Sequence, residues 1–211
     1  AHVGESEEFL SLRDYRPGDP IRHVHWRSYA KTGMPIVKEF QDEFLVRHAL
    51  ILDTFSPAAY SDRFESAVSI AASFACTVET HESLLDLMFV GPRAYRFTSG
   101  RGLAHREQML EVLASVDLCH DHRIEMLENL VLEHQPALSG SICILIDWDE
   151  RRRRFVEMLQ SLGLPSLVFV ITDAETEEPV CPEGFNPGHF HVIPWDQVKE
   201  GLEKLGGGTA P

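Results

Sequence analysis

The sequence has 211 residues and lacks any apolar run near the roughly 20 residues that a membrane-spanning helix requires. We therefore expect that this stretch of chain does not cross a bilayer. Cysteine is scarce as well, and the four cysteines form no Cys-x-x-Cys pair: Cys76, Cys119, Cys143 and Cys181. This pattern excludes a disulfide-stapled miniprotein and predicts reduced thiols in a cytosol-like compartment.

The sequence also lacks the short motifs that mark common catalytic sites. It contains no Gly-x-Ser-x-Gly elbow, no phosphate-binding P-loop, no Gly-x-Gly-x-x-Gly turn and no His-Glu-x-x-His pair. These absences favour a protein that is not an enzyme. The composition, with 44% hydrophobic and 25% charged residues, is that of an ordinary globular domain, so an enzyme and an interaction domain both stay open.

Basic residues are few, with 19 Lys and Arg against 33 Asp and Glu, and the formal net charge is −14. A protein this acidic repels phosphate groups, so we expect no nucleic-acid binding. The imbalance is uneven along the chain. Residues 10–31 carry five basic and two acidic side chains, a balance of +3, whereas residues 44–211 carry 13 basic and 25 acidic ones, a balance of −12. The basic segment is therefore expected to face an acidic partner or a membrane surface.

Buried strands and amphipathic helices alternate after residue 43. Strands are predicted at residues 44–52, 84–90, 94–97, 142–146, 167–171 and 189–193. Helices are predicted at residues 63–78, 103–116, 124–132, 152–162 and 195–205. The alternation predicts an α/β fold: a three-layer, doubly wound, mainly parallel sheet of the Rossmann-like kind. We expect an extended arm with a strand hairpin at residues 1–43, this domain at residues 44–205, and a flexible tail at residues 206–211.

Three of the predicted strands end in an aspartate: Asp53, Asp147 and Asp173. Parallel strands bring their carboxyl ends to one edge of the sheet, where α/β proteins bind ligands. Carboxylates gathered there would suit a hard cation such as Mg²⁺, and Asp53 with Asp147 is the stronger pair. The loops offer four hydroxyl side chains, those of Thr54, Ser56, Thr98 and Ser99. The alternative is structural, since an aspartate at a strand end often only caps a turn or the next helix.

Four consecutive arginines, Arg151–Arg154, open the helix predicted at residues 152–162, and Asp149 is placed as its N-cap. Acidic residues stand just before the run, so local ion pairs on a solvated helix surface are the simpler interpretation. A docking patch for an acidic partner is the alternative.

The arm contains the most organised motif of the sequence, a Pro-Gly-Asp turn that ends at Asp19 and is flanked by Arg13 and Arg22. Glycine permits a positive φ in such a turn, and aspartate bonds to nearby backbone. Either arginine could fold back as a bidentate partner of Asp19. Two prolines interrupt any helical period here, so we expect an extended segment, with Trp26 as its apolar anchor. A structural clasp and a ligand site both stay open for these residues.

Six spaced residues of the arm resemble the signature of a bacterial family, the domain of unknown function 58 (DUF58). In that signature an Arg-x-Tyr-x-x-Gly-Asp-x-x-Arg-x-x-x-Trp stretch precedes a strand. The matching residues are Arg13, Tyr15, Gly18, Asp19, Arg22 and Trp26, and residues 37–40 with Glu43 continue the pattern. The resemblance is strong over residues 9–53 and architectural beyond them. It implies that the α/β domain is von Willebrand factor A-like.

In such domains the carboxyl edge of the sheet can hold a metal-ion-dependent adhesion site (MIDAS), with the motif Asp-x-Ser-x-Ser after the first strand. Here Asp53 matches, whereas Phe55 and Pro57 replace the two serines. The resemblance assigns Asp147 to the later acidic position and Thr98 to the loop threonine. Losing two hydroxyl ligands weakens the binding of a hard cation, so we expect a degenerate site with no cofactor, or with Mg²⁺ held only weakly.

The resemblance further implies membrane-spanning helices upstream of this region. It also implies a MoxR-type AAA+ ATPase as partner, at the cytoplasmic face of a bacterial inner membrane. We therefore interpret the chain as a non-enzymatic interaction or scaffold domain. The alternative is a Mg²⁺-dependent hydrolase or nuclease that uses Asp53, Asp147 and Asp173. A third hypothesis is that the basic arm contacts anionic lipid headgroups.

Overall fold

Two units make up the chain. The computed structural model describes residues 6–43, 46–77, 83–99, 103–120, 124–173 and 179–206. Contacts divide the chain between Leu45 and Val46: one unit, His2–Leu45, contains the predicted arm, and the other, Val46–Pro211, is the α/β domain. The sequence places this boundary two residues earlier, after residue 43.

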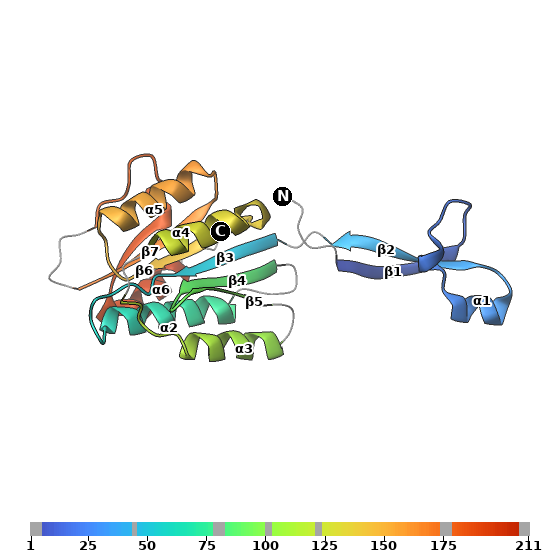
Figure 1. Ribbon diagram of the computed structural model, residues 1–211, viewed down its shortest axis with the longest axis horizontal. Helices are drawn as coiled ribbons and strands as arrows, with labels where there is room; N and C mark the ends of the chain where they lie inside the picture. The colour runs from blue at the N-terminus through green and yellow to red at the C-terminus, as the bar shows by residue number, and fades with distance from the viewer. Residues whose placement is uncertain are drawn as a thin grey trace. The chain divides into compact units, whose positions relative to one another are not determined.

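The arm is built on an antiparallel hairpin of β1 (Ser6–Asp14) and β2 (Ile36–Glu43). The two strands pair over their whole length, with a bulge in β1 between Phe9 and Ser11. The connection contains a short 3-10 turn, η1 (Ile21–His23), and a helix of seven residues, α1 (Trp26–Thr32), which appears in Figure 1. Gly33 ends α1 in the left-handed region, at φ 68°. A glycine takes this conformation without steric cost.

The prediction of an extended segment is therefore wrong for residues 26–32. The two prolines lie upstream of α1 and do not interrupt it. A seven-residue helix is also too short to show an apolar period in the sequence. Backbone pairing with β2 holds the helix in place, because Val24 forms a bridge with Val37 and the His25 N–H donates to the Ile36 carbonyl.

The α/β domain contains one sheet of six strands in the order β5-β4-β3-β6-β7-β8. The strands are β3 (Val46–Leu52), β4 (Ser83–Val90), β5 (Ala94–Ser99), β6 (Gly140–Leu145), β7 (Ser166–Thr172) and β8 (Phe190–Pro194). Five of the six are parallel, whereas β5 returns antiparallel to β4 after a turn of three residues. A connection so short cannot make a parallel crossover. The predicted α/β class is confirmed.

Helices cover both faces of the sheet and make three layers (Figure 1). They are α2 (Asp62–Thr77), α3 (Leu103–Ala114), α4 (Ile124–His134), α5 (Glu150–Ser161) and α6 (Val198–Gly206). Helices α4 and α5 pack on one face, and α2, α3 and α6 on the other. The last helix begins later than predicted, since residues 195–197 form a 3-10 turn. Residues 207–211 of the predicted tail lie outside the described residues.

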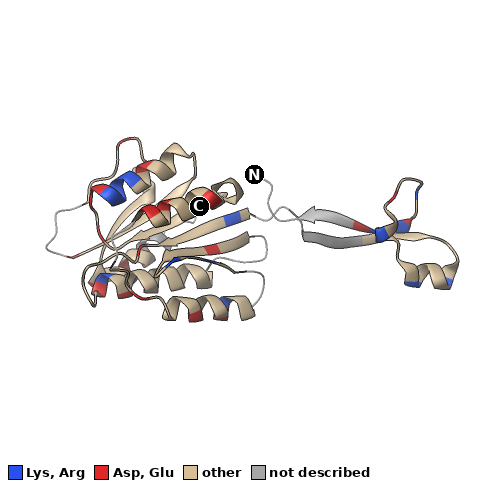
Figure 2. Cartoon of the chain, viewed as in Figure 1, with Lys and Arg blue, Asp and Glu red and all other residues tan. Residues whose placement is uncertain are grey.

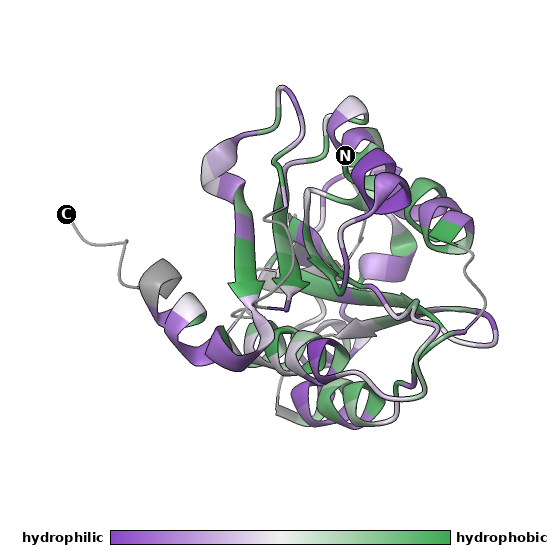
Figure 3. Cartoon of the chain, turned by 90° about the vertical axis from the view of Figure 1, so that its left-hand side faces the viewer, coloured by the Kyte–Doolittle hydropathy of each residue, from purple (hydrophilic) through white to green (hydrophobic). Residues whose placement is uncertain are grey.

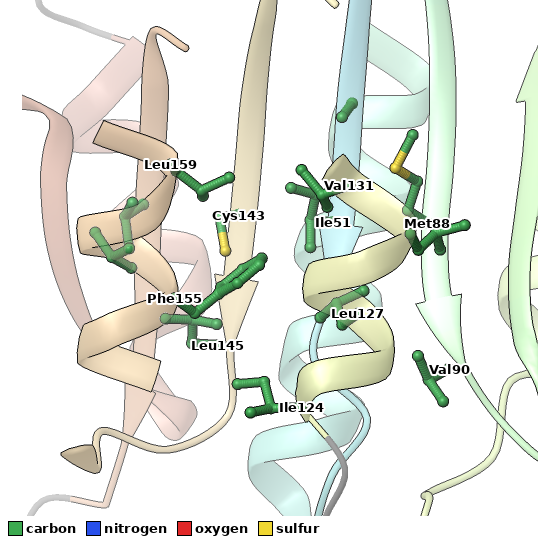
Figure 4. Packing of buried hydrophobic residues seen from close by; sticks show 14 of the residues in the cluster. Ile51, Met88, Val90, Ile124, Leu127, Val131, Cys143, Leu145, Phe155 and Leu159 are labelled. Carbon is green, nitrogen blue, oxygen red and sulfur yellow. The ribbon is translucent and has the colours of Figure 1, made fainter. Parts of the chain in front are cut away.

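Alternating side chains of each central strand supply the two cores. In β3, Ala49 and Ile51 face α4 and α5, whereas Leu50 and Leu52 face α2. Figure 4 shows side chains of α4 and α5 directed at those of the strands, with Phe155 beside Cys143 and Leu145. The strands are hydrophobic through most of their length and the outer helix faces are hydrophilic (Figure 3). No helix within the described ranges is long and apolar enough to span a membrane.

Candidate functional site

The end of β3 carries a buried ion pair between Asp53 and Arg152. Arg152 lies in the first turn of α5, and its Nε donates to Asp53 Oδ2 over 2.6 Å. Its Nη2 donates to Asp53 Oδ1 over 3.4 Å and to the Phe55 carbonyl over 2.8 Å. The Arg152 residue is 6% exposed and Asp53 is fully buried. Burial of two opposite charges at this distance fixes the start of α5 against the end of β3.

Backbone donors complete the environment of the Asp53 carboxylate. The Phe55 N–H donates to Oδ1 over 3.0 Å, and the Ile146 N–H donates to Oδ2 over 3.1 Å. Each oxygen therefore accepts two hydrogen bonds, one from the backbone and one from Arg152. A carboxylate offers about four lone-pair positions, and all are used here.

Asp149 positions the guanidinium from its other side. As the N-cap of α5 it accepts from the Arg152 backbone N–H over 2.9 Å, which confirms its predicted place. Its second oxygen accepts from Arg152 Nη1 over 2.9 Å. Burial lowers the pKa of Arg152, but the carboxylates of Asp53, Asp149 and Asp147 outweigh that effect and leave the pKa raised. The arginine is a permanent cation in this site.

The interpretation of Arg151–Arg154 as a solvated surface is wrong for Arg152. Arg153 and Arg154 do pair with Glu150 on the exposed side of α5, where acidic and basic residues stand side by side (Figure 2). Arg152 instead shares the buried face of α5 with three apolar residues: Phe155, Val156 and Leu159. The spacing of these four positions follows the helical period, so the sequence did contain a signal for the burial of Arg152.

The other two strand-end aspartates also face an arginine. Arg63 of α2 reaches Asp147 Oδ1 at 3.5 Å and Asp173 Oδ2 at 3.6 Å. Asp147 also accepts from the Trp148 backbone N–H. Both carboxyl groups are about half exposed, so these pairs are looser than that of Asp53. The structure thus places all three aspartates at this edge, each beside an arginine.

The hydroxyl residues proposed as ligands are placed differently. Ser56 is buried in the loop after Asp53, and its Oγ accepts from the Ala58 N–H over 3.2 Å. Thr54 donates its hydroxyl to the Val90 carbonyl. Thr98 pairs with Asp86 on β4, which pairs in turn with Ala49 on β3. Across the sheet Thr98 therefore lines up with Ala49, which precedes Asp53 by four residues, or roughly 13 Å along the strand. The structure does not bring Thr98 to Asp53.

These residues do not fit a hard cation. The oxygens of Asp53 are filled by Arg152 and the backbone, and the side chains of Phe55 and Pro57 have no oxygen to offer. Among the described residues, no group of three or more His, Cys, Asp or Glu side chains could hold a metal ion. The guanidinium of Arg152 supplies the positive charge that the Asp53 carboxylate requires.

An aromatic-lined cavity of about 680 Å³ lies beside the loop at residues 54–56. Phe89 and Tyr95 stack in its wall with centroids 5.1 Å apart, and the guanidinium carbon of Arg93 lies 5.1 Å from the Tyr95 centroid. Cys119 also lines the cavity; it pairs with Phe55, and its N–H donates to the Thr54 carbonyl over 2.7 Å. This pairing fixes the loop that follows Asp53.

In the arm, Asp19 is held by Arg13 rather than by Arg22. Nη1 and Nη2 of Arg13 donate to the two Asp19 oxygens over 2.7 and 2.8 Å, and the Arg16 N–H donates to Oδ2 over 2.8 Å. Gly18 supports the turn at φ 109°. The hydrogen bond from Arg13 and the one from the Arg16 backbone lower the pKa of Asp19 from 3.8 to about 2. With both oxygens bound, Asp19 acts as a structural clasp.

Trp26 is not buried as an anchor, because it is 59% exposed. It makes an edge contact with Tyr29, one helical turn along α1. Tyr15 is half-buried and Arg22 is exposed, with its Nε donating to the His23 ring. The six arm residues therefore serve at least two purposes: Arg13, Gly18 and Asp19 make the clasp, and Trp26 and Arg22 remain on the surface.

Comparison with known proteins decides the family. A family model described as protein of unknown function DUF58 matches residues 11–158. The chain belongs to the DUF58 family. This DUF58 chain is 31% identical to the uncharacterized protein YeaD of Bacillus subtilis (strain 168) over 113 residues, which cover 54% of the chain and 27% of YeaD. The match thus spans about a quarter of the length of that relative.

Solved structures agree with the fold of the DUF58 chain. Proximal thread matrix protein 1 of the mussel byssus has a TM-score of 0.54 at 8% identity, covering 76% of this chain and 44% of the mussel protein. The same mussel protein with a zinc-occupied MIDAS motif has a TM-score of 0.53 at 8% identity, with the same coverage. The α/β domain of this DUF58 chain is von Willebrand factor A-like, as the arm motif implied. At such low identity the likeness concerns the fold alone.

Two arginines were not among the candidate site residues, Arg152 and Arg63. Helical spacing could have identified Arg152. Arg63 stands at the start of α2, and only the packing of that helix against the strand ends brings it to Asp147 and Asp173. In this DUF58 chain the chemistry of the carboxyl edge is thus set by arginines as much as by aspartates.

Proposed function

We propose that this DUF58 chain is a non-enzymatic protein-interaction or scaffold domain. The observation that carries the proposal is the pairing of every strand-end aspartate with an arginine, above all Asp53 with Arg152. A carboxylate that acts as a general base or holds a metal needs free lone pairs. Asp53 could accept a proton or a cation only after the buried ion pair had opened, and leaving a buried charge unpaired is costly. The same pairing disfavours the alternative of a Mg²⁺-dependent hydrolase or nuclease.

The partner we propose is a MoxR-type AAA+ ATPase. We further propose that the domain belongs to a membrane-anchored protein and works at the cytoplasmic face of a bacterial inner membrane. Both proposals rest on the resemblance of the arm to the DUF58 signature and on the family membership of residues 11–158.

The experiment is a binding titration of the 211-residue chain against the MoxR-type ATPase of the same organism. The ATPase is tested without nucleotide, with ADP and with a non-hydrolysable ATP analogue. We expect saturable binding in at least one nucleotide state, and no consumption of phosphodiester or phosphomonoester substrates by the chain itself. Absence of binding in all three states would contradict the proposed function, as would turnover that Asp53→Asn abolishes.

A further inference from the structure

Large apolar side chains are exposed on the arm more densely than elsewhere. Among the described residues, ten such side chains are exposed, and half of them lie between residues 12 and 34: Leu12, Ile21, Trp26, Tyr29 and Met34. Ile21 is 69% exposed and Met34 is 62% exposed. Exposed apolar residues are unremarkable when scattered singly, but a local concentration of this kind marks an interaction surface.

The two aromatic rings of α1 contact each other edge to face. Trp26 and Tyr29 lie one helical turn apart, with ring centroids 6.1 Å apart and ring planes at 85°. The His25 ring bonds to Ser28 Oγ over 2.7 Å at the start of the helix, and the Gly33 N–H donates to the Tyr29 carbonyl at its end. Side chains that already contact each other in the free protein have less conformational entropy to lose when a partner covers them.

The charge around the pair is positive. The charged residues of α1, Arg27 and Lys31, are both basic (Figure 2). Arg16 and Arg22 on the preceding turn are exposed as well. The acid of that turn, Asp19, is taken up by Arg13. Four exposed basic side chains thus lie in the same segment of the chain as two exposed aromatic rings, with Asp14 the remaining acid of residues 10–31.

We propose that this arm-tip surface docks onto an acidic protein surface with an apolar pocket that receives Trp26. The arm-tip surface comprises Ile21, Arg22, Trp26, Arg27, Tyr29, Lys31 and Met34. Trp, Tyr, Met and Arg are the residue types enriched in the centres of protein interfaces and among their energetic hot spots. The excess of basic side chains selects an acidic partner and speeds encounter with it. This inference rests on the proposed function and names the surface that performs it.

A membrane fits this surface less well than a protein does. A helix that lies in a lipid interface buries a continuous apolar face, usually of Leu, Phe and Trp. Helix α1 has seven residues, of which Trp26 and Tyr29 are the large apolar ones. The arm-tip surface offers two aromatic rings and three separated charges, which is the pattern of a specific pocket contact.

The test measures binding of the 211-residue chain to the MoxR-type ATPase with two arm variants and a matched control. The variants are Trp26→Ala and the pair Arg22→Glu with Arg27→Glu. The control is Tyr60→Ala, because Tyr60 is a 65% exposed aromatic residue of the α/β domain. All four side chains are exposed, so thermal unfolding should be unchanged, and this is measured first.

We expect Trp26→Ala to weaken binding about 30-fold or more, as hot-spot residues do. The charge reversal should weaken binding and reduce its salt dependence, and Tyr60→Ala should bind as the wild type does.

The outcomes separate the two proposals. If the wild type binds and both arm variants bind equally well, the inference is overturned and the proposed function stands. If the wild type does not bind the ATPase, the proposed function is wrong, and the inference that rests on it is wrong as well. A different outcome is that the wild type floats with vesicles that contain phosphatidylglycerol, and that Trp26→Ala loses this flotation but keeps ATPase binding. That result assigns the surface to a membrane and overturns the inference. Concentration-dependent dimerisation lost in Trp26→Ala overturns it in favour of a second copy.

Discussion

Arg152 of α5 donates two hydrogen bonds to the buried carboxylate of Asp53, which lies 99 residues earlier at the end of β3. The pair lies where the family resemblance predicts a metal site. A guanidinium and a divalent cation meet the same need there, since either one neutralises a carboxylate that the fold buries. They differ in consequence. A bound metal ion can keep a coordination position open for a further ligand. The Arg152 guanidinium instead donates its hydrogen bonds to Asp53, Asp149 and the Phe55 carbonyl.

Removing Arg152 should destabilise the α/β domain strongly. Arg152→Met leaves Asp53 as a buried charge without its cation, and breaking a buried pair from one side costs about 3–5 kcal/mol. Arg154→Met is the matched control on the same helix, since its pair with Glu150 is exposed and is worth under about 1 kcal/mol. Urea unfolding of the two variants measures the difference. Equal free energies of unfolding for Arg152→Met and Arg154→Met would show that the buried pair does not stabilise the domain.

The clasp of the arm should depend on pH through Asp19. Its pKa falls from 3.8 to about 2 on folding, so the charged form is favoured in the folded arm. The stabilisation is complete above about pH 4 and is lost as the pH falls toward 2. NMR titration of the Gly18 and Asp19 amides follows this change. In Asp19→Asn the same signals should already report an open clasp at neutral pH, and a wild-type midpoint near 4 would contradict the assignment.

Gly18 should resist substitution for a conformational reason. It adopts a φ of 109°, and a Cβ added there meets no atom within 4 Å. The expected cost of Gly18→Ala is therefore backbone strain alone, of about 1–2 kcal/mol. The loss should appear as faster amide exchange in the arm hairpin, with exchange in the α/β domain unchanged. Exchange rates in the arm equal to those of the wild type would contradict the conformation given to Gly18.

The cysteines should differ sharply in reactivity. Cys143 is fully buried in β6, and burial, followed by the nearby charge of Asp53, raises the pKa of its thiol. Cys76 is exposed near the end of α2. Alkylation followed by mass spectrometry should modify Cys76 in the native chain and Cys143 only after unfolding, because the thiolate is the reactive form. Native labelling of Cys143 at the rate of Cys76 would contradict the packing of this core.

The sequence allowed much of the fold to be predicted and less of the site. Strands such as β6 and β7 are short apolar runs, and the prediction places them within two residues of their observed ends. Helix α1 was missed because seven residues cannot show a period. Thr98 was misjudged because the turn after β4 sends β5 back toward the opposite end of the sheet. The short connection at residues 91–93 did imply that reversal, because so few residues cannot join parallel strands.

Arg152 was missed for a different reason. A run of arginines predicts solvation on average, and the burial of one member depends on a partner 99 residues away. Its helical spacing with Phe155 and Val156 was available, but it gains meaning only when a buried carboxylate is known to face that position. An aspartate at a strand end, together with an arginine on the buried face of a following helix, therefore indicates that the arginine occupies the place a metal ion would take.

The most direct test of the account is a calorimetric titration of the wild-type chain with Mg²⁺ and with Mn²⁺ up to millimolar concentrations. The account predicts no saturable heat of binding and no shift of the thermal unfolding temperature, because Arg152 occupies the Asp53 carboxylate. Saturable binding that the exposed control Asp117→Asn retains, and that Asp53→Asn abolishes while it is still folded, would contradict it.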